Sequence, residues 1–370
     1  MKKKRAVILT GQAGQGHFSM AKAYKYWLEQ WGYQAEVYDV LPPLSQKVLN
    51  LLYRIPKAFE SLYKLSDQLL LAQGLVDTVA LEIERRIAKT VPDFDRADLI
   101  ISSHFLIRPH GNKVPKIMLL LDPLAHAVYF TSPKPNYYLA LWERIREDAQ
   151  RFRIPEESLF LTLPLARTSF YQMGKLTLKD KENVKVKIRR KLKVPQSQTL
   201  ILVMAGSGWL HRVEPYLEFL RKTFKDEKVT FVFLCGKNQS FREKMLESYG
   251  DDPKFRFLAW LGEEEIAEWM VAADFGLAFS LAQMSVEAGL VGLPLFIFRV
   301  NGGQEEGYKE VISRQGVGMY IPGEPKNQVD LLKVLLTHAQ GLFDKNLKSW
   351  QKQLMTGPLK TRRAIEQILS

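Results

Sequence analysis

Short apolar runs alternate with longer amphipathic stretches along the whole chain. In the first half, the runs expected to form buried strands are Ala6–Thr10, Leu99–Ile101, Ile117–Leu121 and Tyr137–Leu141. The second half repeats the pattern, with expected strands at Leu200–Met204, Thr230–Leu234, Phe255–Leu258, Asp274–Phe279 and Leu295–Phe298. After Gly16, apolar side chains recur at helical spacing, namely Met20, Ala23, Tyr24, Trp27, Leu28 and Trp31. This alternation predicts an α/β protein with two doubly wound, Rossmann-like domains and mainly parallel sheets.

A strongly basic stretch separates the two halves. Residues 171–195 contain nine Lys or Arg and two Asp or Glu, and they end in Pro195. We interpret this stretch as a linker between a first domain over 1–170 and a second over 196–345. The tail over 346–370 has amphipathic helical spacing, so we expect a helix that packs back on the first domain.

Composition excludes several classes of protein. With 370 residues, 46% hydrophobic and 11% aromatic, the chain can bury large cores and is not disordered. The single cysteine, Cys235, rules out an internal disulfide or a cysteine-based zinc site and indicates a cytoplasmic protein. No apolar run is long enough to cross a bilayer, and Ala6–Thr10 is too short for the core of a signal peptide.

The net charge of +13 points to nucleic acid, an anionic membrane or phosphate-bearing substrates as partners. No recognised nucleic-acid reading motif accompanies the basic residues, so we expect no nucleic-acid partner.

A glycine-rich turn, TGQAGQGH over 10–17, follows the first expected strand and opens a helix. Gly14 and Gly16 let the chain turn sharply and let a ligand approach the backbone. The glycine order is not that of the dinucleotide-binding fingerprint. His17 lies on the first helical turn, at the sheet edge where α/β proteins bind ligands, and is a candidate for proton transfer. An isolated histidine at such a position is more often structural, and both interpretations stay open at this point.

Several motifs resemble a known enzyme family. GQAGQGHFSMAKA at 11–23 is similar to the opening of monogalactosyldiacylglycerol (MGDG) synthases and processive diacylglycerol glucosyltransferases, which are MurG-like enzymes. In the first half, the resemblance continues in DLIISSH at 98–104, DPLAHAVY at 122–129 and the segment Ile154–Leu165. In the second half it is carried by MAGSG at 204–208, LCGKN at 234–238, EAGLVGLP at 287–294 and GGQEE at 302–306.

The resemblance implies the two-domain GT-B glycosyltransferase fold. It also implies an inverting hexosyltransferase that moves a hexose from a UDP-sugar to the hydroxyl of a diacylglycerol-like lipid. The first domain would bind the acceptor and the second the donor, with the reaction in the cleft. UDP-sugar is then a co-substrate, and no cofactor or metal is expected.

The same resemblance assigns roles to individual residues. His17 is the candidate general base; Asp122 and His126, four residues apart, would share a helical face and orient His17 or shape the acceptor pocket. With His104 they form an alternative metal-ligand set that their spacing does not favour. Other acceptor-side residues are Gly14, Gly16, His104 and Tyr129. Donor-side residues are Gly206, Ser207, Gly208, Gly236, Asn238, Ser285, Glu287, Gln304 and Glu305.

Three of the donor-side groups have a specific expected contact. The Gly206–Gly208 turn would hold the diphosphate through backbone N–H groups. Glu287, at a helix start, would take the ribose hydroxyls, and Gln304 with Glu305 the hexose hydroxyls.

The region 44–66 combines a net charge of +3 with many interleaved apolar residues. This composition is typical of an interfacial helix on anionic lipid, and a helix whose apolar face belongs to the domain core is the alternative. A lipid acceptor favours the first interpretation, which makes the protein a peripheral membrane protein.

One segment departs from the family pattern. Where the family has S-K-P-G-G, this chain has Ala278-Phe279-Ser280-Leu281-Ala282, so the lysine and both glycines are replaced. The alternatives are therefore a MurG-like transferase with another lipid-linked acceptor, a UDP-sugar epimerase, and a divergent homologue that only binds lipid or nucleotide.

Overall fold

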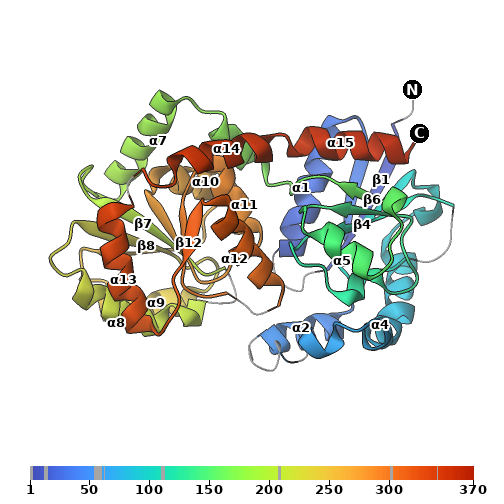
Figure 1. Ribbon diagram of the computed structural model, residues 1–370, viewed down its shortest axis with the longest axis horizontal. Coiled ribbons are helices and arrows are strands. Elements are labelled where there is room, and N and C mark those ends of the chain that lie inside the picture. The colour runs from blue at the N-terminus through green and yellow to red at the C-terminus, as the bar shows by residue number, and fades with distance from the viewer. Residues whose placement is uncertain are drawn as a thin grey trace. The chain divides into compact units, whose positions relative to one another are not determined.

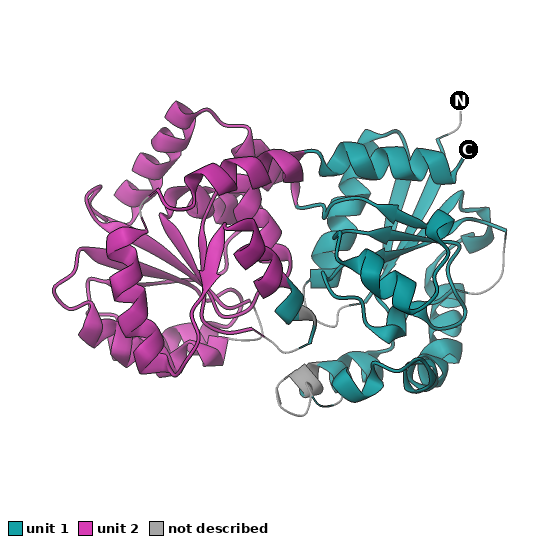
Figure 2. Ribbon diagram, viewed as in Figure 1, with its two compact units in different colours: residues 1–166, 301–307, 356–370 teal, residues 167–300, 308–355 magenta. Residues whose placement is uncertain are grey.

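The computed structural model describes residues 3–11, 16–53, 61, 63–109, 113–206, 210–300, 303–339 and 341–370. The chain divides into two compact units (Figures 1 and 2). Unit 1 comprises residues 1–166, 301–307 and 356–370, and unit 2 comprises residues 167–300 and 308–355. Each unit contains one six-stranded sheet in which every neighbouring pair is parallel.

The sheet of unit 1 has the strand order β2-β1-β3-β4-β5-β6. Its strands are β1 (Arg5–Thr10), β2 (Gln34–Asp39), β3 (Leu99–Ser102), β4 (Lys116–Leu120), β5 (Tyr137–Ala140) and β6 (Leu159–Leu161). Its α-helices are α1 (Gly16–Gln30), α2 (Pro43–Tyr53), α4 (Leu69–Thr90), α5 (Ile145–Arg151) and α15 (Gly357–Ile368). Short 3₁₀ helices are η1 (Phe94–Arg96), η2 (Ala127–Phe130) and η3 (Glu156–Ser158).

The sheet of unit 2 has the order β12-β11-β10-β7-β8-β9. Its strands are β7 (Thr199–Met204), β8 (Val229–Leu234), β9 (Phe255–Leu258), β10 (Phe275–Ala278), β11 (Leu295–Ile297) and β12 (Gly318–Tyr320). Its helices are α6 (Thr168–Gly174), α7 (Leu178–Lys191), η4 (Leu210–Arg212), α8 (Glu214–Thr223), α9 (Gln239–Tyr249), α10 (Glu263–Ala272), α11 (Gln283–Val291), α13 (Pro325–His338) and α14 (Asp344–Met355). Helix α12 (Gln304–Gln315) begins in unit 1 and continues in unit 2.

The central strands of both sheets are almost continuously apolar and fully buried. Strands β3, β7 and β10 show this best, with nearly every residue inaccessible to solvent. This is the composition of parallel strands that helices cover on both faces, and Figure 1 shows helices around each sheet. The expectation of two doubly wound, Rossmann-like α/β domains is confirmed.

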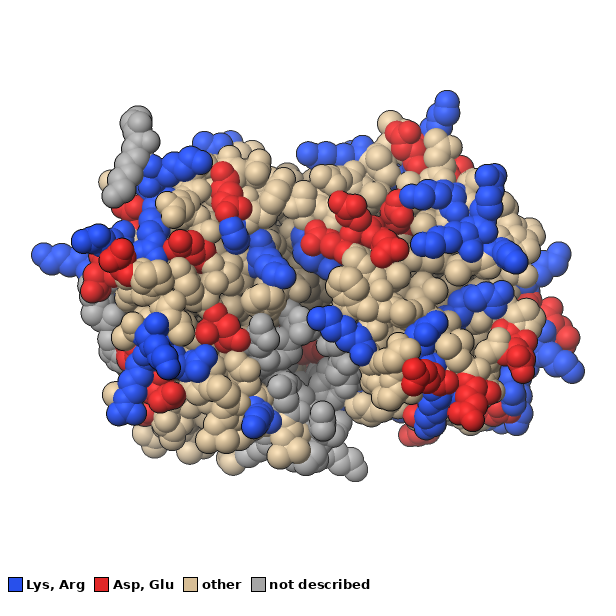
Figure 3. Space-filling view, turned by 180° about the vertical axis from the view of Figure 1, so that it is seen from behind, with Lys and Arg blue, Asp and Glu red and all other residues tan. Residues whose placement is uncertain are grey.

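The basic stretch over 171–195 is folded structure and not a linker. Helix α7 packs on α10 within unit 2, and its charged side chains pair with acids from later in the chain. Arg189 Nη2 lies 2.6 Å from Asp274 Oδ2, and Lys187 Nζ lies 2.7 Å from Glu268 Oε1. These basic side chains therefore form ion pairs within unit 2. In Figure 3, Lys and Arg side chains are likewise spread among acidic ones.

The C-terminal tail divides between the units. Helix α15 contacts β5 and belongs to unit 1. Helix α14 belongs to unit 2 and packs on α11. The N-terminal unit thus ends at Ala166, close to the expected boundary at residue 170.

Candidate functional site

The strand order places the expected acceptor-side residues at one point of the sheet of unit 1. The chain leaves β1 and β3, which are neighbours, toward opposite sides, and ligands of open α/β sheets bind where such connections diverge. His17 follows β1 as the second residue of α1, and His104 follows β3. Gly16 begins α1, whereas Gly14 lies outside the described residues.

The geometry of His17 suits a general base. Its Nδ1 lies 2.5 Å from the carbonyl oxygen of Ser103, so Nδ1 carries the proton and Nε2 keeps a free lone pair. The ring is buried, and burial lowers the pKa of His17 although the Ser103 carbonyl opposes that shift. The imidazole is therefore neutral at pH 7 and able to accept a proton at Nε2.

His104 is completely buried beside His17, with 4.6 Å between the ring centroids. Its Nδ1 accepts a hydrogen bond from the backbone N–H of Leu106 at 3.2 Å, so Nε2 carries the proton. Burial, with a smaller contribution from His17, holds the pKa of His104 well below its usual value. A neutral His104 adds no positive charge next to the candidate base.

A row of ring contacts links this histidine pair to Asp122. The ring of Phe105 stacks on His104 at 4.4 Å and lies 6.0 Å from the ring of Tyr129. The Tyr129 hydroxyl lies 3.5 Å from Asp122 Oδ2, a long hydrogen bond. Asp122 is 8% exposed and lies in the loop that follows β4, the strand next to β3. The structure therefore brings His17, His104, Tyr129 and Asp122 into one neighbourhood.

Asp122 and His126 do not share a helical face. Residues 121–126 are not helical, and η2 begins only at Ala127. Both ring nitrogens of His126 bind the chain: Nδ1 accepts from Val128 N–H at 3.1 Å, and Nε2 donates to Tyr63 O at 2.9 Å. His126 thus caps η2 and holds the segment at Tyr63 in place. This arrangement favours the interpretation that His126 shapes the acceptor pocket over the interpretation that it orients His17.

In unit 2 the corresponding point lies between β7 and β10. Gly206 follows β7 with a φ of 66°, and Ser207 and Gly208 lie outside the described residues. After β10, Phe279 is fully buried and lies 4.8 Å from the Tyr216 ring of α8, so it fills space as an apolar residue. Ala282 has φ 72° and ψ −134°, a conformation that favours glycine.

Glu287 lies in the second turn of α11, not at the helix start, and is 3% exposed. Arg167 binds both of its oxygens: Nε lies 2.7 Å from Oε1 and Nη2 lies 2.8 Å from Oε2. Burial raises the pKa of the Glu287 carboxyl, and Arg167 opposes that rise. Such a fork-to-fork pair fixes the carboxylate but leaves it two further acceptor sites. Sequence reasoning missed Arg167, although it lies only two residues after the matched segment Ile154–Leu165.

Arg299 is a second cation that sequence reasoning missed. It follows β11, and its Nε donates to the Tyr216 hydroxyl at 2.8 Å. Tyr216 in turn donates to Gln328 Oε1 at 2.6 Å. Among the described residues the guanidinium is held by this neutral hydroxyl, and no carboxylate forms an ion pair with it. Tyr216 lies on α8, and its ring meets the ring of Phe279 edge-on. The contact with Tyr216 therefore places Arg299 near the ends of both β7 and β10.

Two other expected donor-side residues, Asn238 and Ser285, have local structural roles. Asn238 caps α9, where its Oδ1 accepts from Phe241 N–H at 3.0 Å, and the Ser285 hydroxyl donates to Ala282 O at 2.7 Å. A β-carbon on Gly236, which has a φ of 57°, would meet no atom within 4 Å, so the backbone there is open to approach. Burial raises the pKa of the Cys235 thiol to about 11, which excludes a reactive thiolate at neutral pH.

The segment with Gln304 and Glu305 groups with unit 1 and not with the donor-side unit. Glu305 is 5% exposed, and a β-carbon on Gly307 would lie 2.9 Å from Leu124 and 3.0 Å from Pro123. The start of α12 therefore packs beside the loop of Asp122. The structure describes only the backbone of Gln304.

Within the described ranges, no three or more His, Cys, Asp or Glu side chains are placed to hold a metal ion. Nor does any described helix have the length and apolar character needed to span a bilayer.

Comparisons with known proteins agree with the resemblance seen in the motifs. No protein-family model matches the chain. A processive diacylglycerol beta-glucosyltransferase of Bacillus subtilis (strain 168) is 24% identical over 336 residues, which cover 86% of this chain and 83% of that relative.

Solved structures show the same fold at low identity. Medicago truncatula UGT71G1, complexed with UDP-glucose, has a TM-score of 0.63 at 10% identity and covers 100% of this chain and 99% of its own. A putative UDP-N-acetylglucosamine 2-epimerase from Listeria monocytogenes has a TM-score of 0.60 at 11% identity, and the match covers 99% of this chain and 95% of that chain. The chain is thus similar to the processive diacylglycerol glucosyltransferases over most of its length, and its fold is the GT-B fold of glycosyltransferases.

Proposed function

We propose that this protein is an inverting hexosyltransferase that uses a UDP-sugar and glycosylates a hydroxyl of a diacylglycerol-like lipid. The observation that carries the proposal is the similarity to processive diacylglycerol beta-glucosyltransferases over 86% of the chain. A buried histidine with a fixed tautomer, at the point where such a fold binds ligands, supports it.

In the proposed reaction, His17 Nε2 takes the proton of the acceptor hydroxyl while the hydroxyl oxygen bonds to the anomeric carbon of the donor. The bond between that carbon and the diphosphate oxygen breaks, and UDP leaves with its electron pair. The Ser103 carbonyl stabilises the imidazolium through the Nδ1–H that it already holds at 2.5 Å. His104, Tyr129 and Asp122 shape the acceptor side around His17.

On the donor side, the backbone at Gly206–Gly208 and the guanidinium of Arg299 stabilise the diphosphate. Glu287 uses its remaining acceptor sites for the ribose hydroxyls, while Gly236, Asn238 and Ser285 shape the nucleotide-binding surface. Gln304 and Glu305 bind hexose hydroxyls. Phe279 supplies no charge, so this chain depends on Arg299 where its family uses a lysine.

Exposed leucines support an encounter with lipid. In unit 1, α2 and α4 expose several large apolar side chains, including Leu44 at 72%, Leu51 at 59% and Leu70 at 84%. We propose that these helices lie on an anionic membrane. A Leu70→Asp variant should float less with anionic liposomes, and Leu178→Asp on α7, where Leu178 is 81% exposed, is the matched control. Equal flotation of wild type and both variants would contradict this surface.

The test of the reaction uses labelled UDP-glucose, UDP-galactose and UDP-N-acetylglucosamine, each with and without diacylglycerol liposomes. The proposal predicts labelled glycolipid from one donor, only with liposomes, and its loss in His17→Ala but not in His338→Ala, an exposed control. Label in an isomeric UDP-sugar would instead indicate an epimerase, an activity named for one neighbour of this fold. Binding of UDP without turnover would indicate a divergent homologue.

A further inference from the structure

Hydrogen bonds join the segment before helix α4 to the short helix η2. Asp67 lies two residues before α4, and its Oδ1 accepts from the backbone N–H of Ala127, the first residue of η2, at 2.8 Å. His126 binds the same segment from the other side, since its Nε2 donates to Tyr63 O at 2.9 Å. The first N–H groups of a helix have no partner within it, so Asp67 supplies one to η2.

Two longer side chains extend this connection. Arg151, the last residue of α5, binds Asp67 twice: Nη1 lies 3.0 Å from Oδ2, and Nη2 donates to the carbonyl oxygen at 3.3 Å. On α4, the side-chain amide of Gln73 donates to Ser132 O at 2.8 Å and accepts from Ser132 N–H at 2.7 Å. Ser132 follows η2 by two residues, so side chains from α4 and the segment before it bind η2 at its start and just after its end.

Helix η2 also contacts the rings around the candidate base. Its Tyr129 ring lies 6.0 Å from the ring of Phe105, and the Phe105 ring lies 6.2 Å from that of His17. The Tyr129 hydroxyl lies 3.5 Å from Asp122 Oδ2. The segment before α4 is therefore connected to the proposed acceptor side through η2.

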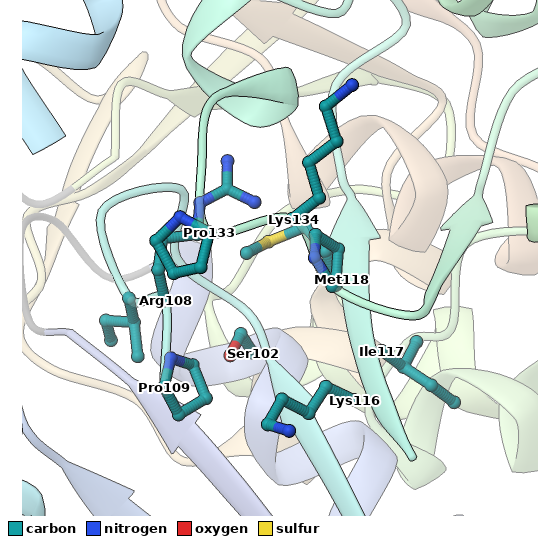
Figure 4. Close-up of a pocket in the computed structure, with 10 residues that line it drawn as sticks. Ser102, Arg108, Pro109, Lys116, Ile117, Met118, Pro133 and Lys134 are labelled. Atoms are coloured by element: carbon teal, nitrogen blue, oxygen red, sulfur yellow. The ribbon is translucent and has the colours of Figure 1, made fainter. Parts of the chain in front are cut away.

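A buried arginine fixes η2 to the loop after β3. Arg108 is 4% exposed, and its Nη2 donates to Val128 O in η2 at 2.5 Å. Figure 4 shows Arg108 beside Pro133, and both line a small crevice together with Ser102. The loop after β3 also carries His104, so this contact holds η2 next to the loop of that histidine.

Asp67 lies among exposed apolar side chains. We call these side chains the leucine cluster, and they are Leu65, Leu69, Leu70 and Leu71. A carboxylate at this position opposes binding to anionic lipid, because it carries the same sign of charge as the membrane surface. Its contacts with Ala127 and Arg151 therefore point to a different role for Asp67, which is to hold η2 at a fixed position relative to the leucine cluster.

We propose that Asp67 is a positioning residue that couples the leucine cluster to the acceptor side. This inference rests on the proposed function, in which these leucines meet a membrane and His17 takes the proton of a lipid hydroxyl. When the leucine cluster binds the membrane, Asp67 holds η2 so that the hydroxyl of a membrane lipid can reach His17. An acceptor in solution does not depend on this alignment, so the coupling favours acceptors that a membrane presents.

The first test compares diacylglycerol in liposomes of phosphatidylglycerol and phosphatidylcholine with a short-chain diacylglycerol in solution. Asp67→Ala should lower kcat/KM for the liposome acceptor about tenfold, as expected for the loss of a hydrogen bond to a charged group, and should lower it much less for the short-chain acceptor. KM for the UDP-sugar should stay the same. Asp67→Asn keeps an oxygen for the Ala127 N–H and should restore most of the activity.

The matched control is Asp95→Ala, which removes an exposed carboxylate from η1 in unit 1 and changes the net charge by the same amount. It should behave as the wild type with both acceptors. An equal loss for Asp67→Ala with both acceptors, which a purely structural role predicts, would overturn the proposal. Absence of glycolipid from the wild type with either acceptor would instead contradict the proposed function.

Hydrogen exchange with the same liposomes gives a second test, which does not require sugar transfer. In the wild type, liposomes should slow exchange in peptides from both α4 and η2. In Asp67→Ala, the α4 peptides should remain protected, whereas the η2 peptides should exchange as they do without liposomes. Gln73→Ala should weaken the same coupling through the contact with Ser132.

The variant should fold, because Asp148 Oδ2 on α5 still accepts from the Ala125 N–H at 2.8 Å and supports the loop before η2. Exchange of η2 that does not respond to liposomes in the wild type would overturn the proposal. The same protection of η2 in the wild type and in Asp67→Ala would also overturn it.

Discussion

Replacing Ala282 by glycine should stabilise unit 2. Ala282 precedes α11 with φ 72° and ψ −134°, which glycine adopts readily and which strains any residue with a β-carbon. Its carbonyl accepts hydrogen bonds from the backbone N–H of Ser285 at 2.9 Å and from the Ser285 hydroxyl at 2.7 Å. These bonds hold the strained conformation in place, and glycine preserves both.

The expected gain is the difference between two effects. Residues in sparsely populated backbone regions cost about 1–3 kcal/mol, which the substitution relieves. Glycine gives the unfolded chain more freedom, which costs about 0.5–1 kcal/mol. The free energy of unfolding of unit 2 should therefore rise by about 0.5–2 kcal/mol.

Urea unfolding, followed by hydrogen exchange of peptides from unit 2, measures this change. Ala278→Gly is the matched control. Ala278 lies in the buried strand β10, so glycine there should lower the stability of unit 2. If Ala282→Gly destabilises unit 2 as much as the control does, the assignment of strain to Ala282 is refuted.

Three further predictions concern charge. Burial lowers the pKa of His17, His104 and His126, so below about pH 6.5 the unfolded chain binds protons that the folded unit does not. The free energy of unfolding of unit 1 should then fall as the pH is lowered, by up to about 1.4 kcal/mol per pH unit for each histidine. In hydrogen exchange, unit 1 should open at a higher pH than unit 2 as the solution is acidified. Parallel opening of both units would contradict this. Glu287→Gln should lower the free energy of unfolding in urea by about 2–4 kcal/mol, because it leaves the largely buried Arg167 without its charged partner. A decrease below about 0.5 kcal/mol, which is usual for a surface substitution, would contradict this prediction. Arg299→Met should lower the affinity for UDP at least tenfold, measured by calorimetry, and leave the affinity for uridine unchanged. An equal loss of affinity for both ligands would contradict a phosphate contact.

The interior of both sheets was predictable from the sequence, and three of their edges were not. All nine strands expected from apolar runs are present within two residues of their expected ends. The missed strands β2, β6 and β12 are all edge strands with half-exposed residues. An edge strand packs on fewer neighbours, so it does not need a continuous apolar run.

Contacts between distant parts of the chain account for the remaining differences. The basic helix α7 has the composition of a linker, and only its contacts with Glu268 and Asp274 show that it is part of unit 2. In the same way, the partner of Glu287 lies 120 residues away and cannot be read from local spacing. Positions at strand ends, such as His17 and His104, follow directly from the strand pattern, whereas the orientation of each ring does not.

The most direct test of the central claim is the structure of the lipid product made with diacylglycerol liposomes from labelled UDP-glucose, UDP-galactose and UDP-N-acetylglucosamine, each supplied separately. Nuclear magnetic resonance of the extracted lipid should show a new hexosyl lipid in which the sugar is β-linked, because a single displacement by a base-activated hydroxyl inverts the α-linked donor. Product should be lost in His17→Ala. An α-linked product, or label that remains entirely in nucleotide or free sugar in the presence of the liposomes, would contradict the account.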